Sequence, residues 1–328
     1  MTRLFTDGAE MQDTLFWDTV SNVTVESSTP YISPYYYAVA TNALRNLVTS
    51  ASMCYFRARV RHSSTTTTAY YVSFRNLTNT MGRISLDATQ HWTAIVGSST
   101  TVGTSTATFN TDQWYLLEVY YTVADSGGRF VVKIDGNTEI DYTGDTKYST
   151  QTTFDNIYFA RGGAGTLLLD DLALNDGIGT TDNSWIGAGI VLKITPDSDG
   201  ATNQWLLSSG STAYGLTDDF PNDGDTTYIY ASGSSTGNKQ NLGMTSFDGS
   251  GKTILRVWGV GRARKTLADG SIIKIGTLAS GGTPVTGSAV LTTSYARVVG
   301  PEATVNPVDS QPWEEADINA LEFVSEVG

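Results

Sequence analysis

Short segments in which polar and apolar residues alternate follow one another closely through the first half of this chain of 328 residues. A period of two places every second side chain on one face of the backbone, as in a β-strand with one buried side. Turn residues at 125–128 and 135–137 favour tight hairpins between neighbouring segments. Many short strands joined in this way predict a β-sandwich or jelly roll. The clearest segments are 35–40, 53–62, 70–77, 91–96, 114–123, 129–135, 137–144, 156–162 and 167–174.

The stretch 176–185 is polar and contains glycines, so we expect a junction between two domains there. Alternating segments continue beyond this stretch, for example at 186–195, 252–265 and 270–277. The second half of the chain therefore also has the pattern of a β-rich domain.

These patterns predict an all-β protein with two β-sandwich (jelly-roll) domains. The first domain is expected at 1–176, a linker at 177–184, and the second domain at 185–328. One short helix is expected within 312–321, because a proline and two glutamates suit the first turn of a helix.

The charge balance argues against nucleic acid as a partner. The chain holds 33 acidic residues against 20 lysines and arginines, which gives a formal net charge of −13. Proteins bind DNA and RNA mainly through basic contacts to phosphate, and an acidic chain repels other polyanions. We therefore expect no nucleic-acid partner.

Scarce cysteine and histidine exclude several kinds of site. Cys54 is the single cysteine, so we expect no internal disulfide and no cysteine-based zinc site. His62 and His91 are the only histidines, and neither lies in a recognisable catalytic or metal-binding motif. The N-terminus lacks the apolar core of a signal peptide, and no segment approaches the length of a membrane span. We expect synthesis in the cytoplasm and no membrane insertion.

Three motifs resemble those of concanavalin A-like, laminin-G-like jelly rolls. Residues 5–20, FTDGAEMQDTLFWDTV, resemble the opening strand of these domains, 113–146 resemble their central hairpin, and 167–176, LLLDDLALND, resemble their closing strand. The resemblance covers residues 5–176 and implies a lectin-like sandwich for the first domain.

Four later segments resemble a region that follows such a jelly roll in virion proteins of tailed bacteriophages. They are 184–208, 214–232, 261–266 and 312–328, in this order. The resemblance implies a non-enzymatic structural protein of the phage particle, such as a head decoration, fibre or tail protein. It also implies a place in the virion and other capsid or tail proteins as partners. A homo-oligomer is expected, because positions in a virion are repeated by symmetry.

Two other functions stay open for a chain of this fold. The first is a carbohydrate-binding module, alone or as the part of a virion protein that adsorbs to host-surface glycans; the tyrosines of 31–37 could stack on sugar rings. The second is a glycoside hydrolase. Glu139 and Asp141 lie on one face of an expected strand, as paired carboxylates would, but no third acid follows at Thr143 as in glucanases of this fold. We therefore expect no catalytic residues.

Asp170 and Asp171 lie side by side in an apolar segment, where two unpaired carboxylates would repel each other. The resemblance to concanavalin A-like domains implies a structural Ca²⁺ between the first and last strands. Asp7, Glu10 and one of the two adjacent aspartates would then hold the ion. The alternative is a solvated pair, since alternation points only one of the two side chains inward.

A basic patch interrupts the acidic chain at 252–265. Alternation places Arg256, Trp258, Arg262 and Arg264 on one face of an expected strand. Arginine and tryptophan are enriched in protein interfaces, so this face is a candidate interface with another copy of the chain or with an acidic neighbour. The alternative is an exposed strand whose arginines pair with nearby acids.

Overall fold

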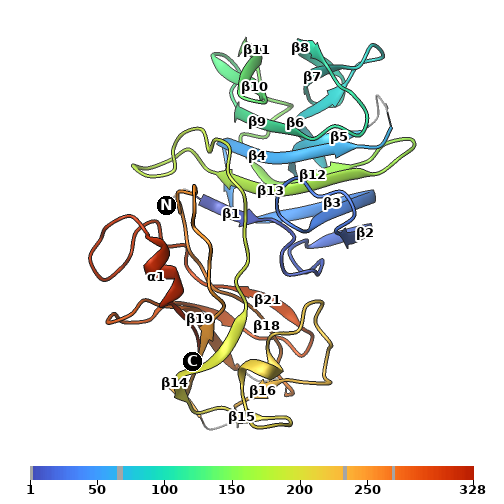
Figure 1. Ribbon diagram of the computed structural model, residues 1–328. Helices are drawn as coiled ribbons and strands as arrows, with labels where there is room; N and C mark the ends of the chain where they lie inside the picture. Colours follow the sequence, from blue (N-terminus) through green and yellow to red (C-terminus); the bar gives the residue numbers. More distant parts are fainter. Residues whose placement is uncertain (1–2, 65–68, 232–234, 268–269) are drawn as a thin grey trace. The chain divides into compact units, whose positions relative to one another are not determined.

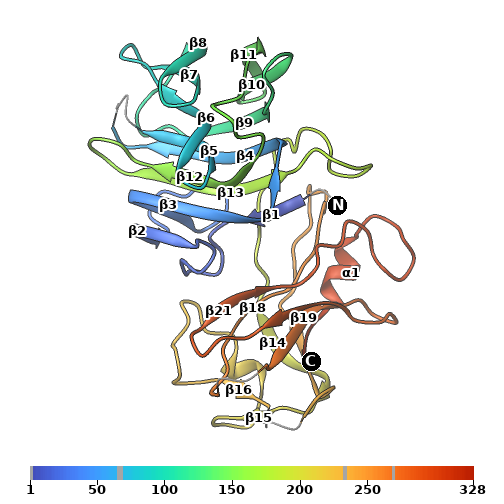
Figure 2. The same ribbon diagram turned by 180° about the vertical axis from the view of Figure 1, so that it is seen from behind.

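The computed structural model describes residues 3–64, 69–231, 235–267 and 270–328. Its contacts divide the chain into unit 1, Met1–Leu192, and unit 2, Lys193–Gly328 (Figures 1 and 2). Strands dominate both units, so the prediction of an all-β protein is confirmed. Among the described residues, no helix is long and apolar enough to cross a membrane.

Unit 1 is one antiparallel sheet that folds over on itself. Its path runs β11-β10-β9-β4-β13-β3-β12-β5-β6-β7-β8, with β1 paired to β13 and β2 to β3. The strands are β1 Arg3–Asp7, β2 Thr19–Glu26, β3 Tyr36–Ala51, β4 Met53–His62, β5 Tyr70–Asn76, β6 Asn79–Leu86, β7 His91–Val96, β8 Thr100–Thr108, β9 Tyr115–Thr122, β10 Gly128–Ile134, β11 Asn137–Gly144, β12 Phe154–Ala160 and β13 Leu167–Asn175.

The long strand β3 makes the fold-over possible. Its first part, Tyr37–Val39, pairs with β13, whereas its later part, from Asn42 onward, pairs with β12. The two ends of the path then meet, because β8 and β11 lie side by side in both views (Figures 1 and 2). The Oε2 atom of Glu139 on β11 accepts hydrogen bonds from the backbone N–H groups of Thr106 and Ala107. The result is a closed sandwich of two layers, as alternation predicts.

Aromatic side chains fill the space between the two layers. Phe74 on β5 stacks on Tyr121 on β9 with ring centroids 5.2 Å apart, and Trp92 meets Tyr71 at 4.9 Å. All four rings are fully buried. Truncating such a ring to alanine costs about 3–5 kcal/mol, so this cluster contributes a large share of the stability of unit 1.

The hairpin between β10 and β11 forms as its sequence predicts. Asp135 and Gly136 occupy the two turn positions with φ of 49° and 83°, and Ile134 pairs with Asn137. Positive φ at both positions is the type I′ turn that Asp-Gly favours, because its twist matches that of the flanking strands.

The boundary between the units lies at Leu192, eight residues beyond the predicted end of the linker at residue 184. The segment 185–192 stays with unit 1 because side chains of the first sheet bind its backbone. Glu118 accepts a hydrogen bond from the Gly187 N–H at 2.9 Å, and Asp171 accepts one from the Val191 N–H at 2.7 Å. The prediction of a strand at 186–195 is therefore wrong. The next strand after β13 begins at Pro196.

Unit 2 contains a five-stranded antiparallel sheet in the order β14-β17-β22-β19-β20. The small sheet β18-β21 packs on one face of it, where Ile273 and Ile275 of β19 contact Val298 of β21. The strands are β14 Pro196–Asn203, β15 Leu206–Leu207, β16 Ile229–Tyr230, β17 Lys239–Met244, β18 Val260–Ala263, β19 Ile272–Leu278, β20 Val285–Val290, β21 Ala296–Val299 and β22 Glu322–Val327, and the turn η1 is Tyr214–Leu216. Of the strand expected at 252–265, only Val260–Ala263 forms a strand, which is β18.

The predicted C-terminal helix is present as α1, Glu315–Asn319. Glu314 precedes it and forms a capping box with Asp317, which satisfies backbone N–H groups that the helix itself leaves free. Ile318 packs with Trp313 and Leu321 in a small apolar cluster of unit 2.

His62 predicts a loss of stability in acid. It is fully buried on β4, and burial together with the charge of Arg161 lowers its pKa to about 4, against the weaker effect of Asp112. An unfolded histidine has a pKa of about 6.5, so between pH 6.5 and 4 the unfolded chain binds a proton that the folded chain does not. The free energy of unfolding should thus fall by about 3 kcal/mol over this window through His62 alone.

Urea unfolding at pH 7 and pH 4 measures this effect. His62→Gln should lose less stability between the two values than the wild type. An equal loss in the two proteins would contradict the assignment.

Candidate functional site

A pocket of about 680 Å³ lies on the outer face of β4, β9 and β10 in unit 1. The core residues of these strands point inward, so the alternate residues, such as Arg59 on β4 and Glu118 on β9, point to this outer face. The lining residues are Tyr31, Arg59, Trp114, Leu116, Glu118, Lys133, Asp135, Gly136, Trp185, Gly187 and Ala188.

Charged side chains form the floor of the pocket. In the register of the sheet, Glu118 stands between Arg57 of β4 and Lys133 of β10. Arg59 lies 3.8 Å from the carboxylate of Asp135, whose Oδ1 also accepts the backbone N–H of Leu116 at 2.7 Å. Cross-strand charge pairs of this kind hold the side chains in fixed positions on the sheet.

Aromatic rings stand beside the two lining cations. The guanidinium of Arg59 lies 3.9 Å from the centre of the Tyr31 ring, and the Lys133 ammonium lies 3.9 Å from that of Trp185. Trp114 meets the Tyr31 ring edge-on at 6.4 Å and donates its Nε1–H to the carbonyl of Thr29 at 3.0 Å. Cations over aromatic faces are attracted by the ring quadrupole, so these contacts orient Arg59 and Lys133.

The chain that leaves β13 forms one wall of the pocket. Gly187 on this segment donates its N–H to Glu118, and its carbonyl lies 3.4 Å from the Nη1 atom of Arg57. Arg57 also donates Nε–H to the carbonyl of Asp171 at 3.0 Å. Trp185 is brought over the sheet in this way and meets Tyr55 edge-on at 5.5 Å.

The two carboxylates that line the pocket are engaged with the backbone. Glu118 and Asp135 both accept hydrogen bonds from backbone N–H groups, which commits these carboxylates to holding the chain in place. Aromatic rings and fixed polar groups around a solvent-open pocket are typical of saccharide recognition, where rings cover the apolar faces of a sugar and polar groups meet its hydroxyls.

Sequence reasoning named the tyrosines of 31–37 for sugar stacking, and Tyr31 lines the pocket, but it missed the other lining residues, although a further signal was present. Arg57, Arg59 and Arg61 recur at every second position in a strongly acidic chain, so they share one face of β4. Trp185 carried no such signal, because it lies in the expected second domain and the contact with the first sheet is visible only in the structure.

Both aspartates of the 170–171 pair are buried, which corrects the expectation that one points to solvent. Asp171 has φ of 50°, and the pairing of β13 with β4 is irregular between Asp170 and Ala173. A bulge of this kind inserts an extra residue, so the alternation of faces is broken at that point.

Hydrogen bonds hold both carboxylates. Asp170 accepts the hydroxyl of Ser33 at 2.8 Å and the N–H of Asp171 at 2.7 Å, and Asp171 accepts the N–H of Val191. Burial, the charge of Asp171 and, more weakly, that of Glu10 raise the pKa of Asp170 to about 9. Burial also raises the pKa of Asp171, against the effects of the Val191 N–H and Arg57.

Part of the predicted calcium set therefore comes together. β1 pairs with β13 and places Asp7 opposite Leu172, where Asp7 accepts a hydrogen bond from the Tyr37 hydroxyl. Among the described residues, Asp171 Oδ2 is buried and accepts no hydrogen bond, which suits a cation ligand. No group of three or more histidine, cysteine or acidic side chains in the described ranges is arranged for a metal ion. Calcium stays a prediction, and a proton on Asp170 relieves the same repulsion.

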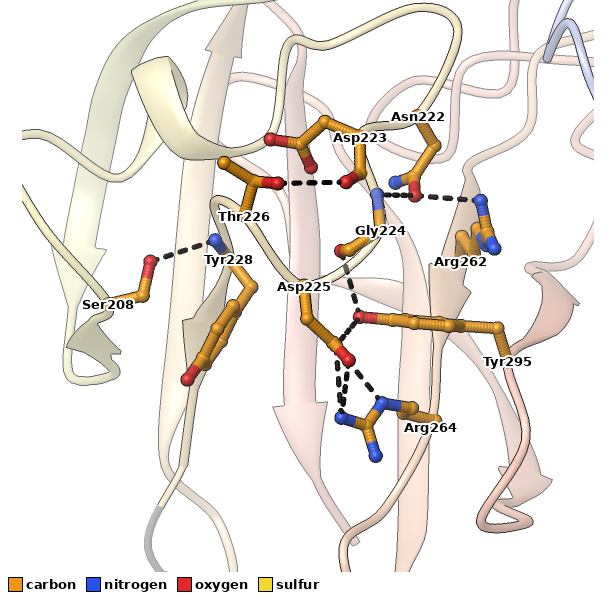
Figure 3. Close-up of polar contacts among 10 residues, drawn as sticks. All are labelled: Ser208, Asn222, Asp223, Gly224, Asp225, Thr226, Tyr228, Arg262, Arg264 and Tyr295. Atoms are coloured by element: carbon orange, nitrogen blue, oxygen red, sulfur yellow. Dashed lines mark hydrogen bonds and ion pairs between the residues drawn. The ribbon is translucent and has the colours of Figure 1, made fainter.

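The predicted interface residues form contacts inside unit 2. The guanidinium groups of Arg262 and Arg264 lie 4.4 and 5.3 Å from the centre of the Tyr295 ring. Figure 3 shows them on opposite sides of this ring. Arg264 binds both carboxylate oxygens of Asp225 at 2.9 and 3.0 Å, and Arg262 binds the side chain of Asn222 at 2.7 Å.

The remaining two members lie before β18. Arg256 pairs with Glu302 at 3.2 Å, and Trp258 is half-buried. The pairing of arginines with nearby acids is thus what the structure shows for Arg256 and Arg264, and an interface with another chain stays a prediction.

Glu139 and Asp141, the carboxylates considered for glycoside hydrolysis, both bind other groups of the protein. Glu139 binds the backbone of β8, as described above, and Asp141 forms an ion pair with Arg129.

Asp170 is expected to make unit 1 less stable as the pH rises. Between about pH 4, where an unfolded aspartate titrates, and pH 9, the folded chain holds a proton that the unfolded chain has released. Its stabilising effect is complete below pH 4 and is lost as the pH rises through 9. The melting temperature should fall more between pH 6 and 9 in the wild type than in Asp170→Asn, and equal slopes would contradict this.

The repulsion between Asp170 and Asp171 can be relieved by a bound Ca²⁺ ion or by a proton on Asp170. A calcium titration distinguishes these two cases. If Ca²⁺ binds, it should raise the melting temperature of the wild type at pH 7.5 and leave the double variant Asp170→Asn/Asp171→Asn unchanged. The calcium prediction fails if neither melting temperature moves.

No protein-family model and no curated protein matches this chain. Solved structures with some similarity include an endo-β-1,4-glucuronan lyase from Trichoderma reesei, with a TM-score of 0.44 and 12% identity over 53% of this chain and 95% of the lyase. An alginate lyase has a TM-score of 0.34 and 16% identity over 45% of this chain and 83% of its own. A carbohydrate-binding module from Bacillus subtilis has a TM-score of 0.33 and 12% identity over 48% and 97%. At TM-scores below 0.5, these similarities do not identify a function for this chain.

Proposed function

We propose that this protein is a non-enzymatic glycan-binding component of a tailed-bacteriophage particle, and that the pocket on β4, β9 and β10 is its binding site. The observation that carries the binding role is the combination of Tyr31, Trp114 and Trp185 with fixed charged groups around one solvent-open pocket. The lining strands belong to a closed sandwich, so the site stands on a rigid support.

The two tryptophans and Tyr31 supply the apolar part of the site. All three are half-buried, so part of each ring faces solvent. Trp114 is held by its hydrogen bond to Thr29, so its orientation costs little entropy when a ligand binds. Sugar rings have apolar faces that pack on such aromatic surfaces.

The place in a virion rests on the sequence alone. Its support is the order of the four segments that resemble tailed-phage virion proteins, at 184–208, 214–232, 261–266 and 312–328. In such a particle the glycan would lie on the host surface, and many copies of a weak site would bind with high avidity.

A glycan array with the purified chain tests the binding role. Positive glycans should lose about tenfold in affinity in Trp114→Ala, since removing a central aromatic contact costs about 1–2 kcal/mol. The control Tyr228→Ala removes an exposed ring of unit 2, and its affinity should equal that of the wild type. No binding above background, or equal losses in both variants, would contradict the proposal.

Mass spectrometry of purified phage particles that carry this gene tests the virion role. The chain should be found in stoichiometric amounts with the capsid or tail proteins. Its absence from intact particles, or failure of the purified chain to associate with them, would overturn this part of the proposal while leaving glycan binding untouched.

A further inference from the structure

We propose that the pocket of unit 1 selects an anionic saccharide, one whose sugars carry carboxylate or sulfate groups, and that Arg59 and Lys133 bind the negative group. This inference rests on the proposed glycan-binding function and specifies its ligand class.

The charge around the pocket departs from that of the rest of the chain. The protein has a formal net charge of −13, yet three arginines of β4 and Lys133 of β10 gather on one face of the first sheet. Two of these cations are balanced within the protein. Arg61 pairs with Asp112 at 3.1 Å, and Arg57 is compensated by Asp171 and Glu118.

The other two cations are the ones that line the pocket, and their balance is incomplete. Lys133 forms no ion pair with any residue in the described part of the chain, and its ammonium group lies over the Trp185 ring. Arg59 is 8% exposed, and its nearest carboxylate oxygen, on Asp135, is 3.8 Å away, longer than a hydrogen bond. The Nε–H of Arg59 is buried and has no acceptor among the described residues.

The acids of the pocket offset part of this charge, Asp135 beside Arg59 and Glu118 opposite Lys133, and both acids are also engaged with the backbone. Glu118 accepts the Gly187 N–H, and Asp135 accepts the Leu116 N–H, so a carboxylate oxygen of each is directed at the backbone. A ligand with its own negative group would pair with the Lys133 ammonium and with the guanidinium of Arg59. Charge-assisted bonds of this type are about twice as strong as neutral ones.

The aromatic rings have a second role in this arrangement. Tyr31 lies over Arg59 and Trp185 over Lys133, each at 3.9 Å, so one side of each cation is covered by a ring. The rings limit the motion of the two side chains before the ligand arrives, and preorganised charges bind more tightly than mobile ones.

Calorimetric titration with matched saccharides tests the proposal on the full chain. One pair is oligogalacturonate and its neutral methyl ester; the second is a sulfated oligosaccharide and its desulfated form. At least one acidic member should bind at least tenfold more tightly than its neutral counterpart, and the difference should shrink as salt is raised from 50 to 500 mM.

Lys133→Gln should abolish most of this preference, because it should lower the affinity for the acidic member far more than the affinity for the neutral member. Lys133→Arg should restore the preference, because the charge is kept. Lys147→Gln removes a lysine that pairs with Asp125 away from the pocket and serves as the matched control. Melting curves of the variants establish that each one is folded.

The outcomes separate the two levels of the proposal. Equal affinity for both members of each pair would overturn the anionic preference and leave glycan binding intact. An acidic preference that survives in Lys133→Gln would overturn the site assignment. Loss of binding to every saccharide in the folded wild type would overturn the proposed function itself.

Discussion

The buried guanidinium of Arg57 connects the parts of unit 1 on which the candidate site depends. It is 4% exposed, and it bonds the carbonyl of Asp171 on one side and approaches that of Gly187 on the other. Burial lowers its pKa, whereas the nearby charges of Asp171 and Glu118 act in the opposite direction. Removing this cation would leave buried acids uncompensated, which costs several kcal/mol, and would release the segment that carries Trp185.

The bulge at Asp171 is the second constraint, and it explains why the wall of the pocket exists. A regular strand would point one aspartate to each face, but the positive φ of Asp171 turns its carboxylate to the N–H of Val191. The chain after β13 is thereby held against the first sheet. Strain at one residue, offset by hydrogen bonds, is a common way to direct a chain toward a functional surface.

Unit 1 was far more predictable than unit 2, for a physical reason. The expected strands 53–62, 91–96 and 137–144 coincide with β4, β7 and β11, because each alternates along the chain and turns apolar side chains toward the core. In the second half of the chain, the apolar residues of 186–195 and most of those of 252–265 lie in segments without regular secondary structure. Ile194, Ile254 and Val257, for example, pack around the short helix, so their alternation does not report a strand.

The sequence by itself determined the all-β class, most strands of unit 1, the Asp135-Gly136 hairpin and the C-terminal helix, because these follow from local conformational preference and from alternation. Only the tertiary structure decided the pocket and the burial of both aspartates. Tyr31, Trp114 and Trp185 are far apart along the chain and meet through the register of β4, β9 and β10 and the path of the chain after β13. A period of two shows which residues share a face of a strand, but what later covers that face depends on contacts between distant segments.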